Sequence, residues 1–339
     1  MRGQLETSKR KELKGLIHFS KEMISAFGMA LICIVYIVQA FKIPSSSMEN
    51  SLLIGDQLLG LKFIYGAPIL PFSYAKFPGI VDPKAGDAVI FKSPNNSGKS
   101  FIKRCVAGPG QVVEIIETKL YVDKKPVELP PDGQYLHNGQ QYFDRITYFD
   151  PLHIPAKGDT IYPERLPVRE FLFFKHLLRQ ENPRKSVRIY LDCYLDGKLS
   201  NSVNLFSNTG RKLYSFDDIN NSSVIDSIDD WTILARTVEK LKFSLKRNLT
   251  LHNQYIDIKT KINLDGKPVN TYIVKKDNYF MLGDNRDNSL DSRYWGYVNR
   301  QFIQAKPIII YFSLDKDVPL WLLPLKIRWN RIGKLIRST

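Results

Sequence analysis

The chain has 339 residues, of which 43% are hydrophobic and 24% charged, so it can bury a full core and a long disordered protein is excluded. Its length allows one large domain or two smaller ones. The formal net charge of +15 suits either nucleic acid or an anionic membrane surface. Because the basic residues are spread along the chain without a zinc-finger, helix-turn-helix or RNA-binding aromatic motif, we favour the membrane and expect no nucleic-acid partner.

An apolar segment near the N-terminus predicts a transmembrane anchor over residues 23–41. The stretch reads MISAFGMALICIVYIVQAF and carries no charge. As a helix it covers roughly 28 Å, enough to cross the hydrocarbon core. The segment is preceded by six basic residues but followed by a single one, Lys42, before Asp56. The positive-inside rule therefore places residues 1–22 in the cytoplasm and the chain after Phe41 on the outer side. The basic residues that precede the segment are Arg2, Lys9, Arg10, Lys11, Lys14 and Lys21.

Two other interpretations of this segment stay open. One is a buried core helix, which the lopsided charge disfavours. The other is a cleaved secretory signal, because Val38-Gln39-Ala40 resembles a small-residue cleavage site. A stretch of about twenty residues before the apolar run favours a retained anchor.

The chain after the anchor predicts a mainly β fold with antiparallel sheets. Short β-branched and aromatic runs are bounded by Gly, Pro or Asn, and Asp265-Gly266 and Asp196-Gly197 are hairpin-turn signals. We expect one β domain in two parts, 42–126 and 265–339, separated by an α/β insertion at 127–264 of unread function. The expected strands are 87–92, 100–107, 111–116, 119–123, 186–196, 255–265, 270–275 and 306–314, and the expected helices 168–180 and 230–246.

An irregular apolar stretch lies about twenty residues after the predicted anchor. Residues 63–80 read FIYGAPILPFSYAKFPGI, which is too broken by proline to span a membrane. The stretch is either a core loop or an exposed lip that rests on the bilayer, and we favour the lip because the domain is tethered beside it. Its candidate members are Phe63, Ile64, Tyr65 and Phe77.

The cysteines indicate neither a metal nor a disulfide framework. Cys33 lies in the apolar segment, so only Cys105 and Cys193 could pair, and we favour three free thiols. The sequence has no Cys-x-x-Cys motif and no His/Cys cluster, so we expect no metal and no cofactor.

A serine-rich segment directly after the anchor is the first candidate for chemistry. PSSSM, Pro44–Met48, offers hydroxyl nucleophiles, which need a base. His18 lies on the cytoplasmic side by the topology above. The other histidines, in ordinary surface or core contexts, are His137, His153, His176 and His252.

Lysine is the alternative base, provided that burial removes its charge near neutral pH. Lys103 lies in the apolar strand SFIKRCVA beside Arg104, and alternation would turn one of the two inward. The competing interpretation is a solvated Lys–Arg pair on an edge strand.

The most specific cluster is YFMLGDNRDNSLDSRYWG, Tyr279–Gly296, which is typical of a tight, self-hydrogen-bonded loop. In an extended chain Ser289, Asp291 and Arg293 fall on one face, with a hydroxyl beside a carboxylate–guanidinium pair. A calcium loop is the alternative, but the regular ligand spacing and the closing Glu are missing.

These clusters, in this order behind an N-terminal anchor, resemble the bacterial type I signal peptidases (leader peptidases), over about 41–113 and 266–313. The resemblance implies that Ser47 is the nucleophile and Lys103 the base. It implies an oxyanion hole made by Ser45 and the Ser47 N–H. It also implies that Ser289 orients the lysine, and that Asp291 and Arg293 form a structural ion pair. The tail RWNRIG, 328–333, is weakly similar to the Gram-negative enzymes.

The chain departs from the family in two places. Asn50-Ser51-Leu52 stands where Pro-Thr-Leu is usual, and Gln111 follows Gly110 where an acid is common. Neither change removes a reacting group.

The resemblance implies a serine endopeptidase of the bacterial cytoplasmic membrane. It would remove signal peptides from exported preproteins after a small residue, at Ala-x-Ala sites, without a metal or nucleotide. The rivals are a self-cleaving repressor with the same Ser–Lys chemistry and a catalytically silent, membrane-tethered binding module. The oligomeric state is not indicated.

Overall fold

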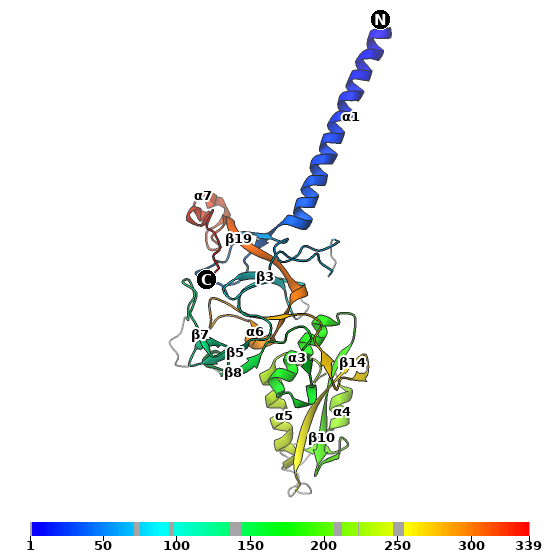
Figure 1. Cartoon of the computed structure of the whole chain (residues 1–339), viewed down its shortest axis with the longest axis vertical. Coiled ribbons are helices and arrows are strands. Elements are labelled where there is room, and N and C mark those ends of the chain that lie inside the picture. Colours follow the sequence, from blue (N-terminus) through cyan, green and yellow to red (C-terminus); the bar gives the residue numbers. More distant parts are fainter. Residues whose placement is uncertain are drawn as a thin grey trace. The chain divides into compact units, whose positions relative to one another are not determined.

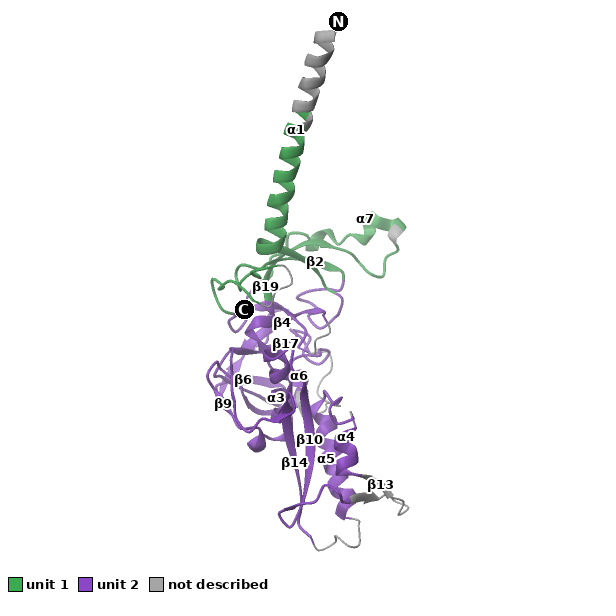
Figure 2. Ribbon diagram, turned by 90° about the vertical axis from the view of Figure 1, so that its right-hand side faces the viewer, with its two compact units in different colours: residues 1–43, 55–82, 304–336 green, residues 44–54, 83–303, 337–339 purple. Residues whose placement is uncertain are grey.

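The computed structural model describes residues 2–70, 75–94, 98–135, 144–206, 212–222, 224–246 and 254–338. It confirms a mainly β fold with antiparallel sheets (Figure 1). Two compact units are interleaved in the sequence (Figure 2). Unit 1 comprises residues 1–43, 55–82 and 304–336, and unit 2 comprises 44–54, 83–303 and 337–339. The predicted insertion, 127–264, belongs wholly to unit 2.

Unit 1 begins with a long helix that contains the apolar segment. Helix α1 (Arg2–Ile32) continues as one π-helical stretch, η1 (Cys33–Ile37). Residues 17–37 are long and apolar enough to cross a membrane, and their side chains are not buried by the protein. The predicted end at Phe41 is wrong, because Val38–Lys42 form strand β1. The Lys62 ammonium donates to the carbonyl oxygens of Ile34 (2.8 Å) and Val35 (3.3 Å), so it satisfies two acceptors that the helix end leaves open.

A three-stranded antiparallel sheet, β1–β2–β19, forms the centre of unit 1. Its other strands are β2 (Asp56–Leu61) and β19 (Ile303–Ser313). The buried Asp56 carboxylate accepts bonds from Ser313 Oγ (2.7 Å) and from the Arg331 guanidinium (2.6 Å to Nη2). A buried charge is tolerated when it is paired in this way, so the basic tail is tied to the sheet. Short helical turns lie at η5 (Leu320–Leu322), α7 (Leu323–Lys326) and η6 (Trp329–Arg331).

The apolar stretch 63–80 folds back on itself, with residues 71–74 outside the described part. Pro68 bridges to Lys76, and Phe77 N donates to Ala67 O at 2.9 Å. The phenyl groups of Phe63 and Phe77 are 38% and 50% exposed, and Ile64 is half-buried. Tyr65 is only 1% exposed, so its assignment to an exposed lip is wrong.

Unit 2 holds, among others, two antiparallel arrangements of four strands. One contains β3 (Ala88–Lys92), β4 (Ser100–Ala107), β17 (Asn278–Leu282) and β18 (Val298–Asn299) in that order. The other has the order β7–β6–β5–β8, from Lys125–Val127, Lys119–Val122, Val112–Ile116 and Tyr148–His153. Shorter elements are α2 (Asp144–Thr147), β9 (Thr160–Ile161), η2 (Pro163–Arg165), β16 (Tyr272–Ile273), α6 (Ser292–Trp295) and η4 (Arg300–Phe302).

The insertion contains a pair of long antiparallel strands with helices packed on it (Figure 1). Strands β10 (Val187–Leu195) and β14 (Ile256–Leu264) pair along their whole length, and both predicted helices are present as α3 (Val168–Glu181) and α5 (Trp231–Lys246). Its shorter elements are β11 (Lys198–Leu199), β12 (Asn204–Phe206), β13 (Lys212–Ser215) and α4 (Phe216–Asn221). Strand β15 (Lys267–Pro268) follows the insertion and pairs with β14.

The two predicted hairpin turns are confirmed. Asp265-Gly266 joins β14 to β15 and Asp196-Gly197 joins β10 to β11, with positive φ at all four residues, as a type I′ turn requires. Two more such turns, Glu117-Thr118 and Asp123-Lys124, lack glycine and gave no turn signal in the sequence.

Side-chain amides close the edge of β10 that faces away from β14. Asn220 accepts from Leu191 N and donates to Leu191 O, both at 2.9 Å. Asn201 accepts from Cys193 N at 2.8 Å. Both asparagines therefore take the place of a neighbouring strand. All three cysteines are free thiols, as expected, with Cys105 and Cys193 buried.

Candidate active site

The serine-rich segment forms a tight turn in unit 2. Glu49 N donates to Ser46 O at 2.9 Å and Leu52 N to Met48 O at 2.7 Å. The side chains of Met48 and Leu52 are each 1% exposed, so they anchor the turn in the core. Ser47 is 8% exposed, so its hydroxyl is largely removed from water.

The first family departure has a structural account in this turn. Asn50 has φ of +71°, which proline, fixed near −65°, cannot adopt. Its side-chain amide donates to Gln134 Oε1 at 2.6 Å. The second departure is also bonded locally, because Gln111 accepts from Gly108 N (2.8 Å) and donates to Asp123 (3.0 Å).

Strand β4 presents Lys103 to Ser47. The ammonium nitrogen of Lys103 donates a short hydrogen bond to Ser47 Oγ. The side chain is 4% exposed and its ammonium lies 5.9 Å from the centre of the Phe101 ring. Burial lowers the pKa of Lys103 from its ordinary 10.5 to about 8, against the raising effect of the Asp291 and Asp284 charges. A useful fraction of the lysine is therefore neutral at mildly alkaline pH.

The next residue on β4 is buried as well, so the expectation that only one of the pair turns inward is wrong. Arg104 is 5% exposed. Its guanidinium forms a bidentate pair with Asp284, at 2.7 Å from Nε and 2.6 Å from Nη2. Arg104 can be buried on the other side of the strand because this carboxylate compensates its charge.

The loop after β17 is hydrogen-bonded to the serine turn. Asn285 N donates to Ser47 O (3.1 Å), and Asp284 accepts from Ser51 Oγ (2.6 Å). A Cβ on Gly283 would lie 2.5 Å from Ser47 O and 2.2 Å from Ser289 Oγ, so glycine alone fits there. The sequence predicts no role for Gly283, and for Asn285 only that of a calcium ligand in the alternative interpretation, although both lie in the box Tyr279–Gly296.

The calcium-loop alternative finds no support in this loop. The Asp284 carboxylate is already bonded to Arg104 and Ser51. Over the described ranges, no cluster of three or more His, Cys, Asp or Glu side chains has a geometry that could hold a metal ion.

Asp291 and Arg293 form the expected ion pair, but by a different route. Arg293 Nε and Nη2 each lie 2.8 Å from the Asp291 carboxylate, and both side chains are at most 1% exposed. The prediction that these residues share one face of an extended chain is wrong, because Asp291 caps the short helix α6 and Arg293 lies within it. Burial alone would raise the pKa of Asp291, but the charge and hydrogen bonds of Arg293 hold it below its ordinary value.

Ser289 and Ser45, the two other serines predicted for the site, make at most weak hydrogen bonds there. Ser289 is 8% exposed, and in the described part of the chain its Oγ has no hydrogen-bond partner, so no bond to Lys103 is present. Ser45 Oγ lies 3.4 Å from Ser47 Oγ on the exposed side of the turn.

The histidines found in the described ranges bond elsewhere. His18 pairs with Glu22 at 3.3 Å, and His153 contacts Asp159 at 3.0 Å. His176 bonds to the Trp295 carbonyl oxygen at 2.9 Å. His137 and His252 lie outside the described residues.

A buried serine hydroxyl bonded to a buried lysine, with a carboxylate–guanidinium pair close by, has the geometry of a serine hydrolase that uses an amine base. The comparisons agree. The family described as "Signal peptidase, peptidase S26" matches residues 16–170 and 194–312. The chain belongs to this family and is a serine peptidase.

Curated relatives named signal peptidase I match over most of their length. The protein from Buchnera aphidicola subsp. Baizongia pistaciae is 29% identical over 93% of this chain and 84% of its own. The Aquifex aeolicus protein is 29% identical over 82% of this chain and 77% of its own. The Helicobacter pylori (strain 26695) protein is 25% identical over 96% and 95%.

The burial of Lys103 predicts a stability effect. The gap between a pKa of about 8 and the ordinary 10.5 corresponds to roughly 3 kcal/mol against folding when the lysine is charged in both states. Lys103→Met should therefore raise the free energy of unfolding at pH 7 by up to about 3 kcal/mol. Between pH 8 and 10.5 the native lysine is neutral while the unfolded one still binds a proton, so the wild type gains stability and the difference shrinks.

Denaturant unfolding of both proteins in detergent, at pH 7 and at pH 10, measures this difference. Lys316→Met, at a lysine whose side chain is 60% exposed, is the control and should change little. Equal stability of Lys103→Met and wild type at both pH values would contradict the lowered pKa.

Proposed function

We propose that this protein is a signal peptidase that removes N-terminal signal peptides from exported preproteins, with Ser47 as nucleophile and Lys103 as general base. The observation that carries the proposal is the hydrogen bond from the buried Lys103 ammonium to Ser47 Oγ. Serine is a weak nucleophile unless a base takes its proton, and a lysine with a pKa of about 8 can do so. Membership of the signal peptidase family supports the substrate class.

The proposed reaction is an acyl transfer in two halves. Neutral Lys103 accepts the Ser47 proton as Oγ attacks the carbonyl carbon of the scissile peptide bond. The resulting oxyanion is held by the Ser47 N–H and by Ser45 Oγ, which lies near the nucleophile. The Lys103 ammonium then protonates the leaving amine, and the C–N bond breaks to leave an acyl-enzyme.

Water completes the cycle. Lys103, neutral again, takes a proton from the water that attacks the acyl ester, and returns it to Ser47 as the signal peptide leaves. Ser289, close to the serine turn, orients the lysine in this proposal. Asp291 and Arg293 hold the loop that carries Ser289.

Helix α1–η1 is proposed to hold the enzyme at the bacterial cytoplasmic membrane. Residues 17–37 are long and apolar enough to span it, and the basic N-terminal flank favours a cytoplasmic N-terminus. The preprotein's cleavage site, of Ala-x-Ala type, emerges from the same bilayer, so anchoring raises the encounter rate. The competing hypothesis is a silent binding module on the same scaffold, against which the bonded Ser47 and Lys103 argue.

Purified full-length protein should cleave a peptide bearing Ala-x-Ala at the expected bond. Ser47→Ala and Lys103→Ala should each reduce cleavage to background while the circular-dichroism spectrum is unchanged, because each removes a reacting group. A folded variant that keeps more than a few per cent of activity would mean that the dyad is misassigned. No cleavage by the wild type of any Ala-x-Ala peptide or preprotein would favour the binding module.

The pH dependence should report the lysine. Activity requires neutral Lys103, so kcat/KM should rise with pH through a limb at about pH 8 to 9, in line with a pKa of about 8. Single substitutions of His137, His153, His176 and His252 test whether a histidine, instead of Lys103, is the general base. A limb near pH 6.5 that disappeared in one of them would show a histidine base instead.

Ser45→Ala should lower kcat by about 10- to 1,000-fold, the usual effect of one lost oxyanion donor. KM should change little, because the donor acts on charge that develops in the transition state. Steady-state kinetics on the Ala-x-Ala peptide separate the two constants. A raised KM with an unchanged kcat would argue for substrate binding instead.

The proposed topology is tested on intact spheroplasts. Externally added protease should digest the chain after the helix and leave the N-terminal residues protected, detected with antibodies to tags at each end. Protection of the large C-terminal part would reverse the orientation.

A further inference from the structure

The insertion contacts the catalytic box through one face of helix α3. Positions 173, 176 and 180 are three and four residues apart, so their side chains share a face. His176 Nδ1 donates to Trp295 O at 2.9 Å. Gln180 Nε2 donates to Tyr297 O and its Oε1 accepts from Asn299 N, both at 2.9 Å. These three bonds are buried and all end on backbone atoms, so they fix the course of the chain after α6.

Two further contacts tighten this docking. Gly296 has φ of +83°, and a Cβ there would lie 2.5 Å from the Phe173 ring, so α3 approaches the backbone as closely as a glycine permits. At the first residue of α5, Trp231 Nε1 donates to Arg293 O at 3.0 Å. The insertion thus bonds directly to the backbone of a residue in the Asp291–Arg293 pair.

The far side of His176 faces a charged cluster, although in the described part of the chain its Nε2 makes no hydrogen bond. Its Nε2 lies 3.5 Å from Asp229 Oδ1. The same oxygen receives Arg179 at 3.0 Å and the fully buried Lys175 at 3.3 Å. The imidazole therefore lies between a charged cluster of the insertion and the Trp295 carbonyl, and it donates to that carbonyl, which can only accept.

The charges that face Lys103 make the position of this chain segment matter. Asp291 and Asp284 favour its ammonium form, and Arg293 opposes it. Arg293 compensates Asp291 only while the two side chains remain within bonding distance. If Arg293 moved, the Asp291 charge would act on Lys103 with less compensation, and the lysine would hold its proton more tightly.

We propose that the insertion is a positioning element of the active site: Phe173, His176 and Gln180 on α3, with Trp231 on α5, hold the 293–299 segment so that Arg293 stays paired with Asp291 behind Lys103. The proposal rests on the proposed function. It gives the 127–264 segment a role in the pH at which the enzyme works, in addition to any contribution to stability.

The test compares pH profiles of kcat/KM for full-length variants on the Ala-x-Ala peptide. Trp231→Phe removes the N–H and keeps an aromatic ring, and His176→Ala removes a donor that His176→Asn retains. We expect the acidic limb of Trp231→Phe and His176→Ala to move up by about half a pH unit. That shift would lower kcat/KM at pH 7.5 about threefold, with recovery at high pH, because neutral lysine falls tenfold per unit below the pKa.

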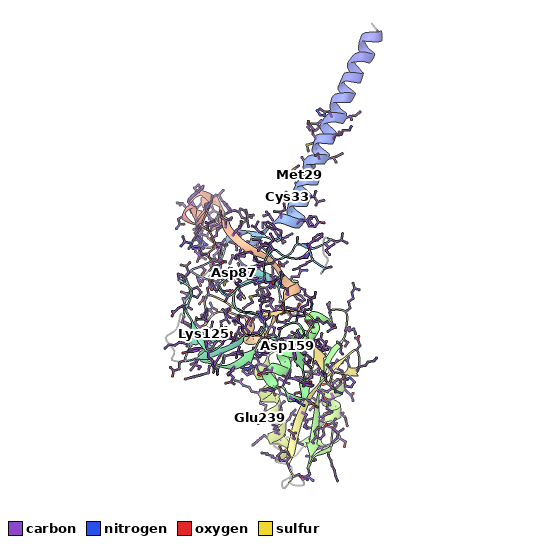
Figure 3. The ribbon with its side chains drawn as sticks, in the orientation of Figure 1. Met29, Cys33, Asp87, Lys125, Asp159 and Glu239 are labelled. Atoms are coloured by element: carbon purple, nitrogen blue, oxygen red, sulfur yellow. The ribbon has the colours of Figure 1, made fainter. Side chains whose placement is uncertain are left out.

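The controls separate positioning from stability. His176→Asn should restore the wild-type limb. Glu239→Ala, at a side chain of α5 that is 74% exposed and labelled in Figure 3, should leave it unchanged. If Trp231→Phe and His176→Ala are folded, melt at lower temperature and keep the wild-type limb, the insertion only stabilises the fold and the proposal is wrong. A wild type whose kcat/KM does not rise with pH between about pH 8 and 9 would instead overturn the lysine mechanism itself.

Discussion

The burial of one lysine is the constraint on which the rest of the site depends. An ammonium group in water is charged at neutral pH and cannot take a proton from a serine. Lys103 is 4% exposed, and desolvation lowers its pKa to about 8. The fold must therefore keep an amine in its core although burial disfavours its charged form. The surrounding residues are arranged so that no nearby negative charge cancels the lowering of its pKa.

Two arginines compensate the negative charges that lie near Lys103. Asp284 and Asp291 both lie close enough to favour the charged lysine. Each is held in a bidentate pair, Asp284 with Arg104 and Asp291 with Arg293. Because each carboxylate is already paired with its own guanidinium, neither acts as a full counter-ion for Lys103. The carboxylates can then fix loops by hydrogen bonds without restoring the ordinary pKa of Lys103.

Much of the fold could be predicted from the sequence, because the signals of strands, helices and turns are local. Strand β4 coincides with the predicted range 100–107, and α3 and α5 end within a residue of the predicted helices. The Gly-containing turns were also found. The Glu117-Thr118 turn was missed because residues with positive φ and no glycine leave no compositional mark.

The remaining errors arise from contacts that no short pattern contains. The helix ends at Ile37 because Val38–Lys42 pair with a strand that follows the serine turn. Arg104 is buried because a carboxylate 180 residues away compensates it. Asp291 and Arg293 were predicted as a pair from an extended chain, whereas the cap of α6 brings them together. The family resemblance predicts which residues react but not the residues that hold them, such as Gly283 and Asn285.

The edge of β10 has a consequence for an enzyme whose proposed substrates arrive as unfolded, extended chains. An open sheet edge is a template on which any such chain can add as a new strand. Along β10 the amides of Asn220 and Asn201 already occupy the backbone groups of Leu191 and Cys193. A passing polypeptide would have to displace them before it could pair there. The two asparagines thus leave this part of the sheet edge closed to the addition of another strand.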